Sequence, residues 1–199
     1  KDVFYGCSGL RNVVLPESLL AIGSNAFYKC IALENLTLNQ SLTTIADYAF
    51  ANCTALKKVV IPDSVTKLGK DIFMGCSNLM DVTLGKGLTA ITSSMFSGCA
   101  GLKELNMPDN ITAIESGAFR GCTGLADFTI GNGVATIAAS AFSGCTSLVN
   151  VTVPYSVNSI ADLAFENCPN LRSFTGKGAS ADERCLSVGN RVIAFAPAG

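Results

Sequence analysis

The chain is built on a strict 23-residue period, set by eight cysteines with no insertion or deletion between them. These cysteines are Cys7, Cys30, Cys53, Cys76, Cys99, Cys122, Cys145 and Cys168. A phenylalanine stands three residues before each cysteine and a leucine three residues after it, as in Phe50, Cys53 and Leu56. Because one short unit cannot bury these apolar side chains alone, the repeat predicts a solenoid in which each coil packs on its neighbours.

Each unit contains one segment with the alternation of a β-strand. The pattern leucine-x-x-aliphatic-x-aliphatic follows each cysteine, as in Leu56, Val59 and Ile61. Successive residues of a strand point to opposite faces, so the aliphatic residues should point inward and the residues between them outward. We therefore expect eight in-register strands that form a parallel sheet on the concave face of the solenoid.

The other half of each unit predicts a short helical turn on the convex side. A serine or aspartate such as Asp47 stands where a helix would be capped, and the pair Ala49-Phe50 follows it. Glycine or asparagine precedes most cysteines, as Gly75 and Asn52 do, which is typical of a left-handed residue that closes a turn. The predicted fold is an α/β solenoid with one helical or 3₁₀ turn in each coil.

Composition and charge argue against several classes of protein. The net charge is -1 and charged residues make up 15% of the chain, so no basic stripe exists and nucleic acid is not an expected partner. No apolar run approaches the roughly 18 residues of a membrane span, so no membrane insertion is expected. The chain opens in mid-repeat without a signal segment, and we expect it to be a piece of a longer protein.

The residue types that carry most enzyme chemistry are missing. The chain has no histidine and no paired C-x-x-C motif, so no zinc site is predicted. Histidine is also the usual general base for a serine or cysteine nucleophile, and no glycine-rich phosphate loop follows a strand. We expect no enzymatic activity, no catalytic residue, no metal and no cofactor.

The periodic cysteines predict a column of buried thiols. Side chains at equivalent positions of stacked coils point the same way, and this geometry disfavours the torsion angle of a disulfide. A free cysteine buried in this way behaves as a small apolar residue. The ninth cysteine, Cys185, lies off the period and is expected to be buried alone in the terminal segment.

The last segment leaves the repeat and predicts a β-hairpin. Residues 186–188 and 192–195 have the composition of strands, and they flank a short turn at residues 189–191 that contains a glycine. The expected division is a solenoid over residues 1–176 and a hairpin over residues 177–199. The hairpin either caps the open end of the array or separates it from further repeats.

The repeat resembles the BspA-like branch of the leucine-rich repeat proteins. Residues 49–62 carry the pattern alanine-phenylalanine-x-x-cysteine-x-x-leucine followed by leucine-x-x-valine-x-isoleucine-proline, and the likeness extends from residue 4 to about residue 176. The resemblance implies a right-handed leucine-rich-repeat superhelix. Similar proteins are exported or displayed at the cell surface, where they act in adhesion or bind host proteins.

Two columns of outward-facing residues on the predicted sheet form the candidate binding surface. The first column is Asn12, Asn35, Lys58, Asp81, Glu104, Asp127, Asn150 and Ser173. The second column is Val14, Thr37, Val60, Thr83, Asn106, Thr129, Thr152 and Thr175. The central residues, which are the predicted contacts, are Lys58, Asp81, Thr83, Glu104, Asn106, Asp127 and Thr129.

Three consecutive carboxylates in the first column are unfavourable for a purely structural sheet. Asp81, Glu104 and Asp127 would stand on adjacent in-register strands, where like charges repel. One interpretation is an acidic patch for a basic partner or a cation. The other is a solvated face whose charges prevent aggregation.

Two functions fit the sequence. The first is an extracellular or cell-surface module, without enzymatic activity, that binds a protein such as a host extracellular-matrix or serum protein, or a neighbouring protein, through the concave face. The second is a structural spacer or stalk that holds another domain away from the cell surface. Substitutions on the concave face would alter binding by the first and change nothing in the second.

Overall fold

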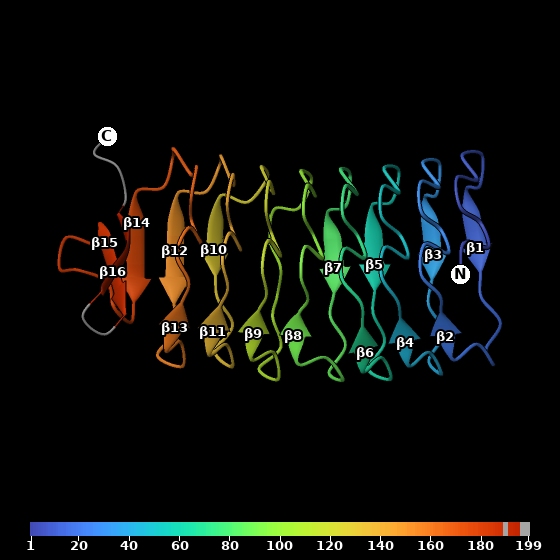
Figure 1. Cartoon of the computed structure of the whole chain (residues 1–199), viewed down its shortest axis with the longest axis horizontal. Coiled ribbons are helices and arrows are strands. Elements are labelled where there is room, and N and C mark those ends of the chain that lie inside the picture. The colour runs from blue at the N-terminus through green and yellow to red at the C-terminus, as the bar shows by residue number, and fades with distance from the viewer. Residues whose placement is uncertain (189–190, 196–199) are drawn as a thin grey trace.

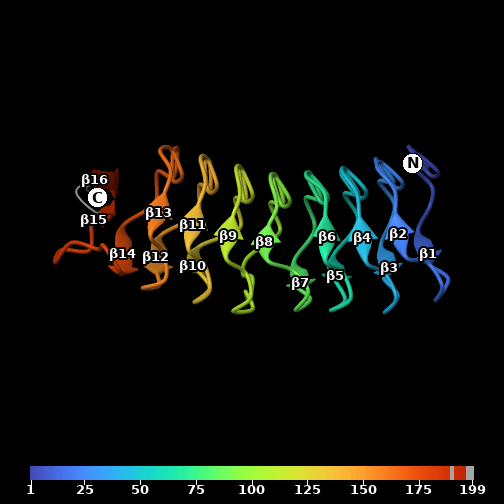
Figure 2. The same cartoon turned by 60° about the horizontal axis from the view of Figure 1, so that its bottom comes forward.

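The computed structural model describes residues 1–188 and 191–195 as a stack of coils. We number the coils by their cysteines, from Cys7 in coil 1 to Cys168 in coil 8, and call the junction of two neighbouring coils a step. The coils stand side by side in a nearly straight row from β1 to β14 (Figure 1). A view turned about the long axis shows each coil as an elongated loop with turns along one edge (Figure 2).

The strands that follow the cysteines build the face on which the candidate site lies, which we call the strand face. They are β1 (Asn12–Val14), β3 (Asn35–Thr37), β5 (Lys58–Val60), β7 (Asp81–Thr83), β10 (Asp127–Thr129), β12 (Asn150–Val153) and β14 (Ser173–Gly176). Paired strands are parallel and in register at the repeat length, as Asn12 with Asn35. This confirms the parallel solenoid expected from the period.

The strand face differs from the expected continuous eight-stranded sheet. Within the described residues, pairing joins β1 to β3, β5 to β7, β10 to β12 and β12 to β14, and coil 5 has no strand on the strand face. Residues 103–107, where this strand was expected, make no backbone hydrogen bond in the described part of the chain. The sheet is therefore interrupted at the coil that carries Glu104.

A second parallel ladder of two-residue strands was not predicted. Its members are β2 (Ala21–Ile22), β4 (Thr44–Ile45), β6 (Lys67–Leu68), β8 (Ala90–Ile91), β9 (Ala113–Ile114), β11 (Thr136–Ile137) and β13 (Ser159–Ile160). Pairing joins β2–β4–β6 and β8–β9–β11–β13. Most of these strands bury one residue, such as Ile45 or Ile114, and Leu68 of β6 is half-buried against the core. The packing of these apolar residues in successive coils also brings the backbones into register.

The core contains columns of identical side chains, which are the phenylalanines, cysteines and leucines of the repeat. Phe50, Phe73 and Phe96 are fully buried, and their ring centroids lie 5.7 and 5.9 Å apart in nearly parallel stacks. Full burial of a phenylalanine stabilises a fold by roughly 1.5–3 kcal/mol. Because each ring packs between rings of adjacent coils, this stabilisation exists only in the stack.

The phenylalanines lie along one edge of the solenoid, which we call the turn edge. The prediction of helical turns on this edge was wrong. No helix of any kind occurs in the described residues, and two residues per coil have left-handed backbone instead, as Ser94 (φ 51°) and Gly98 (φ 73°) do. A helix needs consecutive right-handed residues, so a left-handed residue every fourth position produces successive β-turns. Asp47, expected as a helix cap, accepts the Lys70 N–H of the next coil at 3.0 Å.

The turn edge is hydrogen-bonded without interruption. In every coil from 1 to 7 the N–H of the phenylalanine donates to a carbonyl of the next coil, from Phe4 to Ala26 (2.8 Å) through Phe142 to Ala164 (2.7 Å). The predicted left-handed residue before the cysteine is confirmed at positions such as Gly98 and Asn167. The turn edge is thus the continuous spine of the array.

Beyond β14 the chain folds back on the last coil. β15 (Cys185–Val188) and β16 (Arg191–Phe195) pair antiparallel, and the predicted turn lies partly outside the described residues. The Phe174 N–H of β14 donates to the Glu183 carbonyl at 2.6 Å, and Leu186 is fully buried. Cys185 is half-buried rather than buried as expected.

Candidate binding surface

The strand face carries both predicted columns on its exposed side. The seven predicted contacts are all exposed, while the residues between them, such as Val59, Val82 and Phe128, are buried. Lys58 lies on β5, and β7 and β10 each provide one carboxylate and one threonine. Glu104 and Asn106 belong to the segment of coil 5 that is not a strand. The alternation of the sequence thus places the candidate residues on one surface.

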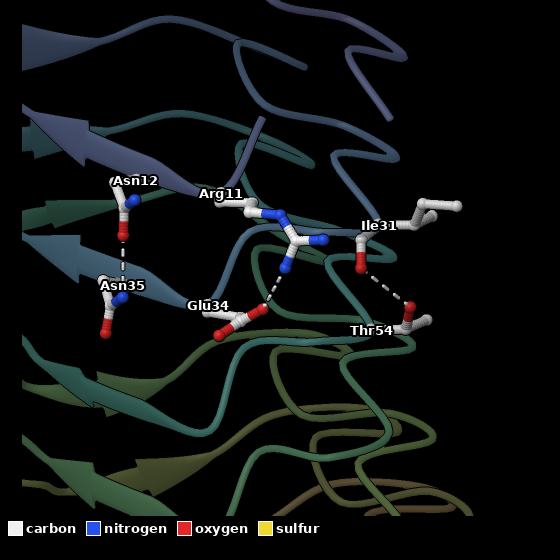
Figure 3. A network of polar contacts seen from close by, with 6 residues as sticks. All are labelled: Arg11, Asn12, Ile31, Glu34, Asn35 and Thr54. Carbon is white, nitrogen blue, oxygen red and sulfur yellow. Dashed lines mark hydrogen bonds and ion pairs between the residues drawn. The ribbon is translucent and has the colours of Figure 1, made fainter. Parts of the chain in front are cut away.

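Steps that are closed by strand pairing also have a direct contact in the first column. At the step between coils 1 and 2, Asn35 Nδ2 donates to Asn12 Oδ1 at 2.7 Å, beside an Arg11–Glu34 ion pair of 2.9 Å (Figure 3). Between coils 3 and 4, Lys58 Nζ lies 2.7 Å from Asp81 Oδ2.

The same holds at the two closed steps of the last coils. Between coils 6 and 7, Asn150 Nδ2 donates to Asp127 Oδ1 at 2.6 Å. Between coils 7 and 8, Ser173 Oγ donates to Asn150 Oδ1, also at 2.6 Å. In total, each of the four closed steps carries one attractive side-chain contact in the first column.

The three open steps have no such contact. Across the residues that the structure describes, neither a hydrogen bond nor an ion pair joins Asn35 to Lys58, Asp81 to Glu104 or Glu104 to Asp127. Asp81 and Asp127 each have a partner on their other side, so Glu104 is the carboxylate of the acidic trio that has none in the described residues. Like charges on adjacent strands repel one another.

The open steps coincide with hollows in the surface. A hollow of about 540 Å³ lies over coils 4 to 6 and contains six of the seven predicted contacts, all except Lys58. A smaller hollow of about 340 Å³ lies between β3 and β5, where Lys58 stands with Thr37, Gln40 and Val60. The predicted site is therefore divided by the Lys58–Asp81 ion pair into an acidic part and a part with one cation.

Sequence reasoning missed part of the lining of the larger hollow. Met80 is exposed at its edge, and the buried residues Leu105 and Phe128 form its floor. Met80 precedes the first column by one residue, so the outward alternation of the strand did not include it. An adjoining hollow of about 240 Å³ adds Asp109, whose position after the strand gives no such signal.

The periodic cysteines form the predicted column of thiols. All nine cysteines lie within the described residues and are free, and those at the period from Cys30 to Cys168 are buried. Cys7 in coil 1 is exposed, so the prediction of burial was wrong for this member of the column. Each buried thiol donates to the phenylalanine carbonyl of the preceding coil, as Cys99 Sγ to Phe73 O at 3.2 Å. Burial raises the pKa of the Cys76 and Cys122 thiols to about 12, so these groups are protonated, unreactive core residues at neutral pH.

The strand face offers carboxylate, amide and hydroxyl groups for polar and ionic contacts. Among the described residues, no group of three or more cysteine, aspartate and glutamate side chains is arranged to hold a metal ion. The hollow over coils 4 to 6 is open and polar, and its carboxylates stand on separate coils. This arrangement can bind a partner through hydrogen bonds and charge.

Stacked coils of 23 residues that carry a leucine at the same position, three residues after each periodic cysteine, define the class of leucine-rich repeat solenoids. The chain belongs to the BspA-type family of this class. The sequence model of the BspA type Leucine rich repeat region, which contains 6 copies of the repeat, matches residues 1–126 and residues 112–185. Solenoids of this family are generally non-catalytic.

Solved structures of bacterial leucine-rich repeat proteins share the fold. A leucine-rich repeat protein from Bacteroides ovatus aligns with 26% identity and a TM-score of 0.74 over 87% of this chain and 51% of its own. One from Eubacterium ventriosum aligns with 26% identity and a TM-score of 0.73 over 78% of this chain and 42% of its own. The chain thus spans about half the length of these relatives or less.

A third relative has a more similar sequence. The leucine-rich repeat protein TpLRR of T. pallidum is 33% identical and aligns with a TM-score of 0.59 over 85% of this chain and 69% of its own. A comparison with curated proteins gives no match. Nowhere in the described residues is there a helix that is long and apolar enough to cross a membrane.

Proposed function

We propose that this chain is a protein-binding module without enzymatic activity, which acts outside the cell or at its surface and contacts its partner through the strand face of coils 3 to 6. The observation that carries the proposal is the hollow over coils 4 to 6, which gathers six of the seven predicted contacts. Solenoids of stacked repeats commonly bind proteins through an extended face.

The chemistry of this surface favours a basic partner. The larger hollow is lined by Asp81, Glu104 and Asp127 and by no lysine or arginine within the described residues. Threonine and asparagine side chains of the second column add hydrogen-bonding groups beside the carboxylates. A protein segment with lysine or arginine would find complementary charge there, which increases the rate of association and fixes its register.

Family membership supports the class of partner and the location. The chain belongs to the BspA-type leucine-rich repeats, and resemblance to similar exported proteins implies binding of host extracellular-matrix or serum proteins. The cell-surface role of this chain rests on that resemblance. The alternative is a spacer that holds another domain at a distance and uses no face for recognition.

The test is binding of the purified chain to immobilised extracellular-matrix and serum proteins. We expect saturable binding that is lost in the triple variant Asp81→Asn, Glu104→Gln, Asp127→Asn. A matched triple variant, Glu17→Gln, Glu166→Gln, Glu183→Gln, changes the net charge equally at exposed sites outside the larger hollow and should bind like the parent. Equal loss in both variants would contradict a specific site, and no binding by any folded variant would favour the spacer.

A further inference from the structure

The first column and the strand ladder vary together along the array. At the four closed steps the N–H groups at the start of the strand donate to the preceding coil, as Met80 and Asp81 donate to the Lys57 carbonyl at 2.9 and 3.1 Å. These are the steps with an attractive first-column pair: Asn12 with Asn35, Lys58 with Asp81, Asp127 with Asn150, and Asn150 with Ser173. At the other three steps both the ladder and the attractive pair are absent in the described residues.

From this correspondence we infer that the first-column pair decides whether a step closes, and that Glu104 holds the strand of coil 5 out of the sheet. Glu104 faces Asp81 on one side and Asp127 on the other, so neither neighbour offers an attractive pair. Closing either step would bring two carboxylates together on adjacent strands. The segment of residues 103–107 therefore remains unpaired.

Other features of coil 5 do not account for the interruption. Its inward residues Leu105 and Met107 are as buried as Val82 and Leu84 of the neighbouring coil. Pro108 follows the segment, but Pro62 follows β5, which is paired with β7. The core and the proline are thus common to open and closed steps.

The remainder of coil 5 is joined to its neighbours. Its second-ladder strand β9 pairs with both β8 and β11. On the turn edge, the Phe73 N–H donates to Met95 at 3.0 Å and the Phe96 N–H donates to Ala118 at 2.9 Å. Coil 5 is therefore open only along the strand face, and its opening produces the larger hollow.

The charge at position 104 would thus control strand pairing at coil 5 and, through it, the shape of the strand face. Placing a positive charge at Glu104 would make attractive pairs with Asp81 and Asp127, and the ladder would then run from β5 to β14. A cationic side chain of a partner set against Glu104 would have the same effect, and this last step rests on the proposed function. The strand face would thus become more ordered when it is occupied.

Amide hydrogen exchange, followed residue by residue by NMR, tests the inference without a partner. By the repeat register, the amides of Lys103 and Glu104 should donate to the Met80 carbonyl, and those of Ala126 and Asp127 to Lys103. In Glu104→Lys we expect these four amides to exchange about tenfold more slowly, as for one net hydrogen bond each. In Asn106→Lys, which adds a positive charge to the second column of the same coil, we expect their exchange to be unchanged.

The converse variant makes the test symmetrical. Lys58→Glu places a like charge opposite Asp81, and the amides of Met80 and Asp81 should exchange faster. The amides of Phe73 and Phe96 on the turn edge report whether each variant is folded and should keep their protection. Unchanged exchange at coil 5 in folded Glu104→Lys, or equal slowing in Asn106→Lys, would overturn the inference, whereas the proposed function would fail only in the binding experiment.

Discussion

The turn edge and the strand face of this solenoid are built from the same coils and yet differ in regularity. Along the turn edge, phenylalanine and cysteine recur in every coil and the phenylalanine N–H bonds to the next coil at all seven steps. On the strand face, the exposed residues change from coil to coil and pairing fails at three steps within the described residues. The turn edge therefore maintains the stack, which leaves the strand face free to vary in sequence.

The largest expected effect follows from breaking the turn edge. Replacing Phe96 by alanine removes a fully buried ring that stacks between Phe73 and Phe119, and we expect the free energy of unfolding to fall by roughly 3–5 kcal/mol. The matched change on the strand face, Thr129→Ala, should alter it by less than about 0.5 kcal/mol because Thr129 is exposed. Urea unfolding measures both, and similar losses in the two variants would refute the division of roles.

The thiol column should make stability fall at alkaline pH. Burial raises the pKa of Cys76 and Cys122 to about 12 in the folded chain, whereas the unfolded thiols keep an ordinary pKa of about 9. The contribution of these two thiols to the free energy of unfolding is therefore fully present below pH 9. It is lost as the pH rises toward 12, by about 1.4 kcal/mol per pH unit for each thiol.

Urea unfolding between pH 8 and pH 10.5 measures this slope. The double variant Cys76→Ala, Cys122→Ala should show a shallower decline than the parent, although it is less stable at pH 8. An identical slope in parent and variant would show that these thiols ionise equally in both states.

A smaller effect is expected from backbone conformation on the turn edge. Gly98 has φ 73°, and a Cβ there would have 3.7 Å to its nearest atom, so Gly98→Ala tests the left-handed backbone alone. We expect Gly98→Ala to lower the free energy of unfolding by roughly 1–2 kcal/mol. Leu163 is exposed and has φ 62°, a left-handed conformation that glycine adopts without strain. Leu163→Gly should therefore raise the free energy of unfolding by up to about 1 kcal/mol. Thermal unfolding of both variants measures whether Gly98→Ala is less stable and Leu163→Gly more stable than the parent. A destabilised Leu163→Gly would contradict the assignment of strain to the left-handed backbone.

Much of the fold could be predicted because the period is strict. The inward direction of Val59 and Ile61, the burial of the cysteines and the left-handed residue before each cysteine all follow from residue types that recur. The helical turn was wrong because its second left-handed position carries residues as different as Tyr48 and Leu163, which give no glycine signal. The repeat thus predicted the packing and one of the two left-handed residues in each turn, but not the other.

The candidate surface was predictable in position and less so in shape. Alternation placed Asp81, Glu104 and Asp127 on one exposed face, and their mutual repulsion was evident from the spacing. Their effect on strand pairing depends on which first-column residues already have a partner at a neighbouring step, as Asp81 has in Lys58. This can be judged only when all seven steps are considered together. The hollow that results, with Met80 at its edge, was therefore visible only in the structure.

The first and last coils of the purified 199-residue chain should respond differently to mechanical force. Phe4 in coil 1 is 41% exposed and stacks on Phe27 alone among the described rings, whereas Phe165 in coil 8 is 7% exposed and contacts the rings of both Phe142 and Phe174. A molecule pulled between its ends should therefore peel from coil 1, one coil at a time. Each release frees 23 residues, a contour length of about 80 Å, so the force trace would be a series of evenly spaced peaks.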